Sequence, residues 1–528
     1  MGVKILSHGG NYLAQAVRQA YSAGQTDYSI EPLVLSYPDG IPVGRIKDGD
    51  SVIFCLRRGE REIQLTEAFV DPQVGDFPRE KYKHLPFVIL TLYHEKFKDL
   101  PVAFAPSRVS NTLGEVLSSF QRRQLHISES EKFAQVTFFL NGGNNQPFDG
   151  ETDIRIPSPR GIPSDQLPEL SLPQVANGVI NGLSKGYEFI VTNFANGDVI
   201  GHTPNREAKL KCAEYIDSHL GRVVEAARSA GYVIVVTADH GNLEELFNSD
   251  GTPNVSHTTN PVPLILIEPG SHPGLTLHPG MLADVAPTIL SLMGLPLPEL
   301  MTGQNLLDDP LVDPRQHMLL VILDGWGIGR QDESNPIYLA RTPNWDRLIS
   351  EYPHTRLEAA GEAVGLNAGK NGNSEAGHMN LGAGRLVLQD DVRLDRAMQD
   401  GSFFTNEIFL QTFKDVTEHH ASLHLISLLS EKSSHGSIDY PLALLRMAKE
   451  HGLSDVFIHV IFDGRSTVPG SAPDLLAKLE GKIAEIGIGQ VVTGIGRGIA
   501  LDRDGNYQKT RLAYDALVYG LGKRYYSS

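Results

Sequence analysis

Residues 318–329, MLLVILDGWGIG, determine the fold that we predict for this chain. An apolar run leads up to Asp324, and glycines with a tryptophan then end it. Such a run predicts a short strand that is buried on both faces of a parallel sheet. Because open α/β sheets bind their ligands at the carboxyl ends of such strands, we expect Asp324 to lie at the functional edge of the sheet.

The composition is that of a globular protein with more than one domain. A chain of 528 residues is too long for a single core, and 41% hydrophobic with 21% charged residues is ordinary for soluble domains. No apolar run approaches the ~18–20 residues that span a bilayer, and no signal core is present, so we expect a cytoplasmic protein without a membrane partner. The net charge of −17 argues against nucleic-acid binding. The only cysteines, Cys55 and Cys212, provide no disulfide framework.

Strand-like runs alternate with helical patterns along most of the chain, which predicts an α/β fold. Apolar residues at helical spacing follow the run at 189–196 and include Leu210, Ala213, Ile216, Leu220, Val223 and Ala227. Further strand-like runs lie at 232–241, 422–430, 456–466 and 490–498. An acidic stretch with two prolines, residues 301–317, reads as a linker before the strand at 318.

Carboxylates and histidines with the character of metal ligands follow several of these runs. Asp198 and His202, in NFANGDVIGHTP, are four residues apart, although an exposed pair of this kind is commonly only solvated. Asp239 and His240, in TADHGN, end a very apolar strand, where a buried carboxylate needs a partner. A capped helix start is the alternative there. His257, beside a turn in SHTTNPVP, indicates little alone.

Ser374 lies among small, turn-forming residues in GKNGNSEAGHMNLGAGR, residues 369–385. Such residues let the backbone approach a ligand, although a serine N-cap of the following helix explains the same string. Nothing local supplies the base that a serine nucleophile requires. A metal ion would lower the pKa of its hydroxyl instead.

Arginines at strand ends form a third set. They are Arg58, Arg61, Arg465, Arg497 and Arg503. Each alone is compatible with an ordinary surface residue, but guanidinium groups also match carboxylate and phosphate oxygens. Two sets of Asp and His ligands, a serine and these arginines suggest phosphoryl transfer with two metals. Such a site suits Mn²⁺, with Mg²⁺, Co²⁺ or Zn²⁺ as alternatives.

Taken together, the motifs resemble the 2,3-bisphosphoglycerate-independent phosphoglycerate mutases of the alkaline phosphatase superfamily. The similarity covers nearly the whole chain and rests on LLVILDGWGIG, GNSEAGHMNLGAGR, NTLGEVL, EKFAQVTFFLNGG, NFANGDVIGHT, TADHGN and HTTNPVPLILI. The order differs, because residues 318–528 resemble the first part of the family and roughly 12–306 its remainder. The chain therefore resembles a circularly permuted member, which is physically feasible where both cuts avoid buried backbone.

The resemblance implies two α/β domains. Residues 107–388 would form an alkaline-phosphatase-like metal and phosphoserine domain. Residues 1–106 and 389–528 would form a smaller substrate-binding domain.

It also implies roles for residues at matching positions. The ligands of the metal that activates the serine match Asp324, Ser374, Asp239 and His240. Those of the second metal match Asp198, His202 and His257. Lys132, in EKFA, matches a lysine that helps hold the phosphoryl group. The residues that hold phosphoglycerate match His435, Arg465, Arg497, Arg503, Arg58 and Arg61.

The implied activity is the interconversion of 3-phosphoglycerate and 2-phosphoglycerate in glycolysis and gluconeogenesis. Ser374 takes the phosphoryl group, glycerate re-orients while it stays bound, and its other hydroxyl takes the group back. The resemblance also implies that two divalent cations are required and that 2,3-bisphosphoglycerate is not. We expect a monomer that acts on a small molecule and has no nucleic-acid partner.

The substrate-binding part departs from the family pattern. Glu431, Lys432 and Ser433 stand where an Asp-Gly-Gly run is usual, and Ser466 replaces an aspartate. Gln135 stands where a histidine is common, and LRR replaces Asn-Phe-Arg at 56–58. Neutral drift and altered specificity both account for these changes. We therefore keep two alternatives to a mutase: a metal-dependent phosphatase or a mutase for another phosphorylated hydroxy acid, and a non-catalytic binding protein.

Overall fold

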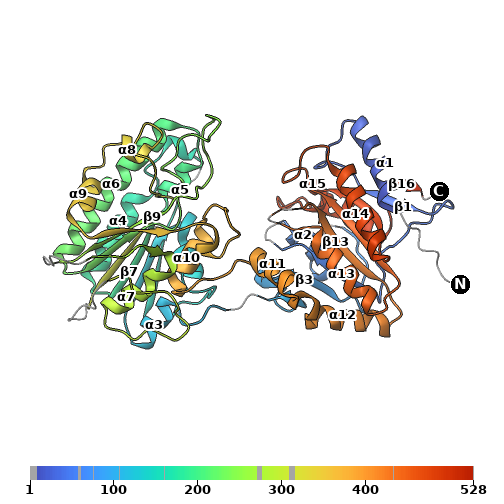
Figure 1. The fold of residues 1–528 in the computed structure, drawn as a ribbon, viewed down its shortest axis with the longest axis horizontal. Helices are drawn as coiled ribbons and strands as arrows, with labels where there is room; N and C mark the ends of the chain where they lie inside the picture. The colour runs from blue at the N-terminus through green and yellow to red at the C-terminus, as the bar shows by residue number, and fades with distance from the viewer. Residues whose placement is uncertain are drawn as a thin grey trace. The chain divides into compact units, whose positions relative to one another are not determined.

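The computed structural model describes residues 9–57, 61–74, 77–105, 108–159, 161–269, 276–307, 316–431, 433 and 435–526. The chain forms two compact units, one of residues 107–392 and one of residues 1–106 with 393–528. Figure 1 shows the blue start and the red end of the chain in the same unit. In the ranges above, no helix is long and apolar enough to span a membrane.

The unit of residues 107–392 is built on a mixed sheet with the strand order β10-β12-β9-β8-β11-β7-β5-β6. Its strands are β5 (Gln124–Glu129), β6 (Glu151–Ile156), β7 (Phe189–Phe194), β8 (Val233–Thr237), β9 (Val262–Ile267), β10 (Gly280–Met281), β11 (Met318–Leu323) and β12 (His354–Glu358). The predicted buried strand is β11, which is fully buried and pairs in parallel with both β7 and β8. It therefore occupies the centre of the sheet.

Helices cover this sheet in Figure 1. They are α3 (Leu113–Ser119), α4 (Leu172–Ser184), α5 (Asn196–Gly201), α6 (Arg206–Ser229), α7 (Val285–Leu292), α8 (Pro336–Leu339), α9 (Pro343–Glu351) and α10 (Ser374–Ala383). Short 3₁₀ turns lie at Ser130–Lys132, Ser164–Gln166, Leu282–Asp284 and Gly361–Val364, and a π-helical turn at Gln135–Phe139. The predicted amphipathic helix is α6, which buries Ala213, Ile216 and Leu220 against the core.

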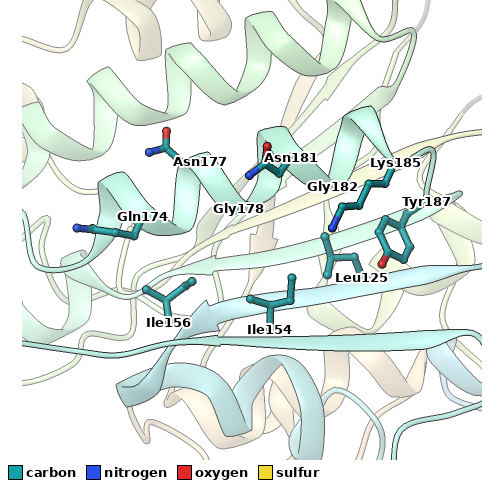
Figure 2. A pocket seen from close by; sticks show the side chains of 10 residues that line it. All are labelled: Leu125, Ile154, Ile156, Gln174, Asn177, Gly178, Asn181, Gly182, Lys185 and Tyr187. Carbon is teal, nitrogen blue, oxygen red and sulfur yellow. The ribbon is translucent and has the colours of Figure 1, made fainter.

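Close packing of α4 on the edge of the sheet depends on two glycines. A Cβ at Gly178 would lie 2.3 Å from Ile127 Cδ1, and one at Gly182 would lie 2.4 Å from Leu125 Cδ2. Figure 2 shows these glycines on the helix, and Leu125 with Ile154 on the strands that it faces. A cavity of about 350 Å³ remains between them. A larger residue at either glycine would push the helix off the sheet.

The other unit interleaves strands from its two chain segments in the order β16-β1-β15-β14-β13-β2-β3-β4. The strands are β1 (Leu33–Ser36), β2 (Ser51–Cys55), β3 (Phe87–Thr91), β4 (Val102–Phe104), β13 (Leu423–Leu429), β14 (Val456–Phe462), β15 (Gln490–Gly496) and β16 (Lys523–Tyr526). Strand β13 pairs in parallel with β14 on one side and with β2 on the other. Neither segment alone therefore completes the sheet.

The helices of this second unit are α1 (Gly9–Ser22), α2 (Ile63–Val70), α11 (Asp390–Asp400), α12 (Glu407–Glu418), α13 (Asp439–Glu450), α14 (Ala472–Ile486), α15 (Arg497–Ala500) and α16 (Tyr507–Val518). Short 3₁₀ turns lie at Glu95–Phe97 and Ser402–Thr405. Helix α11 begins in the first unit and ends in the second. The predicted α/β class is confirmed in both units.

The predicted linker at 301–317 lies partly outside the described residues, which stop at 307 and resume at 316. Before the gap, Leu306 and Leu307 are buried, and Leu307 pairs with Leu277. This part of the stretch therefore packs against the first unit.

Candidate active site

Three neighbouring parallel strands bring their carboxyl ends to one edge of the first unit. Asp324 follows β11 directly, and Asp239 with His240 follows β8. Asp198 lies in α5, the short helix after β7. Because β11 lies between β7 and β8 in register, these side chains meet at one place.

Asp198 is the centre of the first cluster at this edge. Its Oδ1 lies 3.0 Å from His257 Nε2 and 3.2 Å from His202 Nε2. The two imidazole nitrogens are 3.1 Å apart. Asp198 is buried, His257 is half-buried and His202 is exposed. The cluster thus has a buried carboxylate at its base and imidazoles toward solvent.

His240 connects this cluster to a second, fully buried one. Its Nε2 lies 3.5 Å from both Asp239 Oδ2 and Asp324 Oδ1, and 3.8 Å from Asp198 Oδ1. Ligand atoms of Asp239, His240 and Asp324 lie within 4.8 Å of one another, as do those of Asp198, His240 and His257. Asp239 Oδ2 is buried and has an ion-pair contact with His378 Nδ1 at 3.3 Å but no hydrogen bond among the described residues. Such a donor set fits two divalent cations that prefer oxygen and imidazole ligands.

Ser374 is the first residue of α10 and is buried at 7% exposure. Its Oγ lies 3.0 Å from His240 Nε2 and 3.3 Å from Asp324 Oδ1. The N-cap of α10 is Asn373, whose side chain accepts a hydrogen bond from Ala376 N. The alternative prediction, that Ser374 is the N-cap of this helix, is therefore wrong. Its hydroxyl faces the cluster instead, at the start of a helix, where negative charge is favoured.

Lys132 lies at the middle of the acidic groups. Its Nζ donates to Ser374 Oγ at 2.7 Å, to Asp198 Oδ2 at 2.7 Å and to Asp324 Oδ1 at 2.8 Å. Burial alone lowers the pKa of Lys132, but the carboxylates of Asp324 and Asp198 outweigh it and raise the pKa well above its usual value. The ammonium group therefore stays charged beside the serine hydroxyl.

Asp239 and Asp198 remain ionised although they are buried. Burial raises the pKa of Asp239, but His240, His378 and Lys132 together outweigh this and the pKa lies below its usual range. Burial also raises the pKa of Asp198, but Lys132 and the neighbouring histidines together outweigh this and hold the pKa well below normal. Burial lowers the pKa of His240, and Asp239 with its neighbours raises it to about 10. A bound cation would take the place of this proton.

Two buried residues at this edge were missed by sequence reasoning. Asn193 Nδ2 donates to Asp324 Oδ2 at 2.6 Å and lies 3.1 Å from His378 Nε2. His378 Nδ1 lies 2.9 Å from Ser374 O and 3.3 Å from Asp239 Oδ2. Both therefore orient the carboxylates from behind. The four-residue spacing of Ser374 and His378 on a predicted helix was the available signal.

In the second unit, His435 contacts a buried carboxyl group that the sequence did not single out. Its Nδ1 lies 3.1 Å from Glu62 Oε1, and Glu62 is fully buried just before α2. Burial raises the pKa of Glu62, and His435 offsets this only in part. Arg57, also buried, donates to Ser433 O at 2.8 Å, and its backbone N–H donates to His435 O at 2.9 Å.

The two serines among the departures from the family pattern contact each other. Ser466 Oγ lies 3.2 Å from Ser433 Oγ, and Ser466 N donates to Asp463 Oδ2 at 3.1 Å. Asp463 also forms a buried ion pair with Arg497. A cavity of about 620 Å³ has Ser466 and Glu431 in its wall. This part of the second unit is therefore polar, and the charge of the Asp463 carboxylate is already balanced by Arg497.

The remaining predicted arginines differ in their exposure to solvent. Arg61 is buried and donates to Leu501 O at 3.2 Å, whereas Arg465 and Arg503 are exposed. Arg58 lies outside the described residues. All of the predicted metal ligands and Lys132 thus lie in the first unit, and His435 with the described arginines lies in the second.

Two family models match this chain. The Metalloenzyme superfamily model matches residues 24–297, just over half of the 528 residues. A second model, BPG-independent PGAM N-terminus, matches residues 394–528. A region that is N-terminal in that family thus lies after the metalloenzyme region here, which confirms the predicted reversal of order.

Two curated proteins and one solved structure are similar to parts of this chain. The 2,3-bisphosphoglycerate-independent phosphoglycerate mutase of Syntrophotalea carbinolica is 43% identical over 298 residues, and that of Desulforudis audaxviator is 45% identical over 294. Each match covers 56% of this chain and 57% of the relative, so the chain spans little more than half the length of these relatives. A crystal structure of Leishmania mexicana phosphoglycerate mutase at low cobalt concentration is 27% identical, with a TM-score of 0.42, and covers 51% of this chain and 53% of that one.

The larger family match includes Asp198, Asp239, His240 and His257, four of the five residues that form the clusters at the sheet edge, whereas Asp324 lies outside it. Both the matched length and the donor set at this edge point the same way: the chain belongs to the Metalloenzyme superfamily.

Proposed function

We propose that this protein is a cofactor-independent phosphoglycerate mutase, which interconverts 3-phosphoglycerate and 2-phosphoglycerate through a phosphoserine at Ser374. The single observation that carries the proposal is the placement of Ser374 Oγ within hydrogen-bond distance of Lys132 and His240, in a site with three buried carboxylates. The names of the relatives and the matched N-terminal region support the same activity.

Two divalent cations would complete the site. Asp324, Ser374, Asp239 and His240 would hold one of them, and Asp198, His202 and His257 the other. Mixed carboxylate and imidazole ligands favour Mn²⁺, with Mg²⁺, Co²⁺ or Zn²⁺ as alternatives. When bound, the cations lower the pKa of the serine hydroxyl and neutralise charge on the phosphoryl oxygens.

The residues of the chain would carry the transfer in two steps. With the cations bound, Ser374 would have lost its hydroxyl proton. Its Oγ would form a bond to phosphorus while the ester bond between phosphorus and the 3-oxygen of the substrate breaks, and that oxygen would gain a proton. The 2-hydroxyl of bound glycerate then loses its proton and attacks the phosphoserine, which releases Ser374. Lys132, already on the serine hydroxyl, would offset charge on the transferring oxygens in both steps.

The second unit would hold the glycerate. His435, Arg465, Arg497, Arg503, Arg58 and Arg61 would bind the carboxylate, the phosphate or the hydroxyl groups. Proton transfer needs a base, and Ser466 offers none where the family has an aspartate. Glu62 is a base of raised pKa in contact with His435. We assign to this pair the proton that moves between the two hydroxyls of glycerate.

A phosphatase is the second candidate, and the Ser433–Ser466 contact favours it. If glycerate is held less firmly there, water competes for the phosphoserine and inorganic phosphate is released. The same chemistry at the first unit would also serve another phosphorylated hydroxy acid. The products formed from 3-phosphoglycerate distinguish these possibilities.

The test is the product mixture formed from 3-phosphoglycerate with Mn²⁺, followed by phosphorus NMR. We expect 2-phosphoglycerate to exceed inorganic phosphate, and mass spectrometry of the quenched enzyme to locate a phosphoryl group on Ser374. Ser374→Ala should abolish the formation of 2-phosphoglycerate and the phosphorylated enzyme. Ser350→Ala, on the exposed face of α9, should change neither the product nor the phosphorylation. Phosphate as the only product would identify a phosphatase, and turnover by Ser374→Ala would exclude the phosphoserine route.

A further inference from the structure

A second kind of histidine cluster lies in the other unit, on residues that the proposed activity does not use. His84 lies in the loop before β3, Asp415 lies in α12, and His419 caps the end of α12. His84 Nε2 is 2.8 Å from Asp415 Oδ2, and His419 Nδ1 is 3.4 Å from Asp415 Oδ1. The two imidazole rings stack with their centroids 4.5 Å apart. The Asp415 carboxylate therefore contacts both of the stacked imidazole rings.

This arrangement has the dimensions of a metal site with three protein ligands. One ligand atom from each of the three residues lies within 4.8 Å of the others. Bonds of about 2.0–2.2 Å to a tetrahedral cation place its ligands about 3.3–3.6 Å apart, so small rotations of the imidazoles complete the geometry. Asp415 and His419 are four residues apart, on one face of the helix. Imidazole with carboxylate favours Zn²⁺, Co²⁺, Ni²⁺ or Cu²⁺ over Mg²⁺ or Ca²⁺.

Neighbouring groups already orient the cluster as they do around bound metals. Ser51 Oγ donates to Asp415 Oδ2 at 3.5 Å, and His419 Nδ1 lies 2.9 Å from Asp415 O, so the nitrogen that this ring would offer to a cation is Nε2. A ligating histidine commonly donates its other ring N–H to a carbonyl oxygen, and a ligating carboxylate commonly accepts a further hydrogen bond. The side chains of His84 and His419 are 42% and 47% exposed, so a cation can reach them from solvent.

The cluster joins two segments of chain that are far apart in sequence. His84 belongs to the segment before residue 107, and Asp415 with His419 belongs to the segment after 392. We propose that His84, Asp415 and His419 bind a transition-metal cation of the Zn²⁺ class, which clamps the two segments of this unit together. A cation that binds only the assembled unit stabilises it by mass action, because the unfolded chain keeps these ligands apart.

Equilibrium dialysis of the full chain against buffered Zn²⁺, with metal analysis of the protein, tests the clamp. We expect His84→Gln and His419→Gln each to bind one Zn²⁺ per chain fewer than the unsubstituted protein. Where this Zn²⁺ is still detected, its affinity should be at least about 10-fold lower. The matched control is His420→Asn, which changes the adjacent histidine at a left-handed position that asparagine tolerates. The metal ligands of the first unit are intact in all of these proteins.

Thermal unfolding supplies a second measurement that does not depend on counting metal. Zn²⁺ should raise the unfolding temperature of the unsubstituted protein and of His420→Asn by more than that of His84→Gln or His419→Gln. Equal Zn²⁺ content in all four proteins, or equal thermal shifts, would overturn the proposal. Circular dichroism without Zn²⁺ checks that each variant is folded, and the exposure of both histidines predicts that it is.

Discussion

Replacing Glu62 by glutamine should reduce mutase turnover while leaving the fold intact. The carboxyl group is fully buried and lies 3.1 Å from His435 Nδ1. Glutamine keeps the size of the side chain and can still accept a hydrogen bond from His435, but it carries no charge and is not a base. The substitution therefore isolates the proton-accepting role that we assign to the Glu62–His435 pair.

The expected loss follows from the strength of this contact. A hydrogen bond to a charged partner contributes about 1.5–3 kcal/mol, and one between neutral groups about 0.5–1.5 kcal/mol. The difference of about 1–1.5 kcal/mol corresponds to about 10-fold in rate. If Glu62 and His435 together act as the general base, the loss increases toward the ~10²–10⁴-fold range of such groups. We expect kcat to fall by about 10- to 100-fold and KM to change less.

The assay is the rate of 2-phosphoglycerate and inorganic phosphate formation from 3-phosphoglycerate across pH 5.5–9. In Glu62→Gln, the share of inorganic phosphate should rise, and the pH dependence of kcat should change shape. Glu67→Gln is the matched control, because Glu67 lies in α2 and is also a buried carboxylate but contacts Lys96 and Tyr507 instead. Ser466→Asp should restore part of the lost turnover in the Glu62→Gln background. An unchanged kcat, pH profile and product ratio in Glu62→Gln would refute the assignment.

Three further outcomes are expected. Chelation should abolish 2-phosphoglycerate formation and Mn²⁺ should restore it best, and full activity after exhaustive chelation would contradict a site with two cations. Lys132→Met should slow phosphorylation of Ser374, followed by quenched-flow mass spectrometry, by on the order of 10²-fold, because a charged donor to the transferring group is lost; an unchanged rate would remove Lys132 from the mechanism. Burial lowers the pKa of His126 to about 4. The free energy of unfolding should therefore fall as the pH falls from about 6.5 to 4, by up to about 1.4 kcal/mol per pH unit. Burial raises the pKa of Asp153 to about 6, which has the opposite sign, since its contribution is lost as the pH rises from about 3.8 to 6. In urea unfolding between pH 4 and 7.5, His126→Leu should flatten the loss of stability toward acid and Asp153→Asn should steepen it, and identical slopes would show that neither group titrates in this range.

The carboxyl ends of buried strands were the most predictable part of the site. Apolar runs ending in Asp324 and in Asp239 with His240 predicted strands β11 and β8, and the two strands pair in parallel. Since parallel strands end at one edge, the sequence pattern was enough to predict that these side chains share a neighbourhood. Lys132 and His257 were different, because no local pattern marks either one. They were assigned only through the family resemblance.

Contacts between distant segments could not be predicted from local pattern. Glu62 and His435 are 373 residues apart, and His84 and Asp415 are 331 apart. Glu62, the second glutamate in LRRGEREIQL, has no periodicity or turn signal around it that marks it as buried. Its burial depends on how β2 and β13 pair, which is a property of the assembled sheet. Tertiary packing, and not propensity, decides such positions.

The place of β11 in the chain does not matter to the site, because hydrogen bonds and not connections fix a strand in its sheet. From Met318 to Ile322, β11 pairs in register with β8, and from Met318 to Leu323 with β7. Its position, the burial of Asp324 and the distances to Lys132 and Ser374 follow from this pairing. The position, burial and distances are the same whether β11 follows residue 317 or begins a chain, provided that the connection runs over the surface. The order of the segments can therefore be permuted while the geometry at the sheet edge is retained.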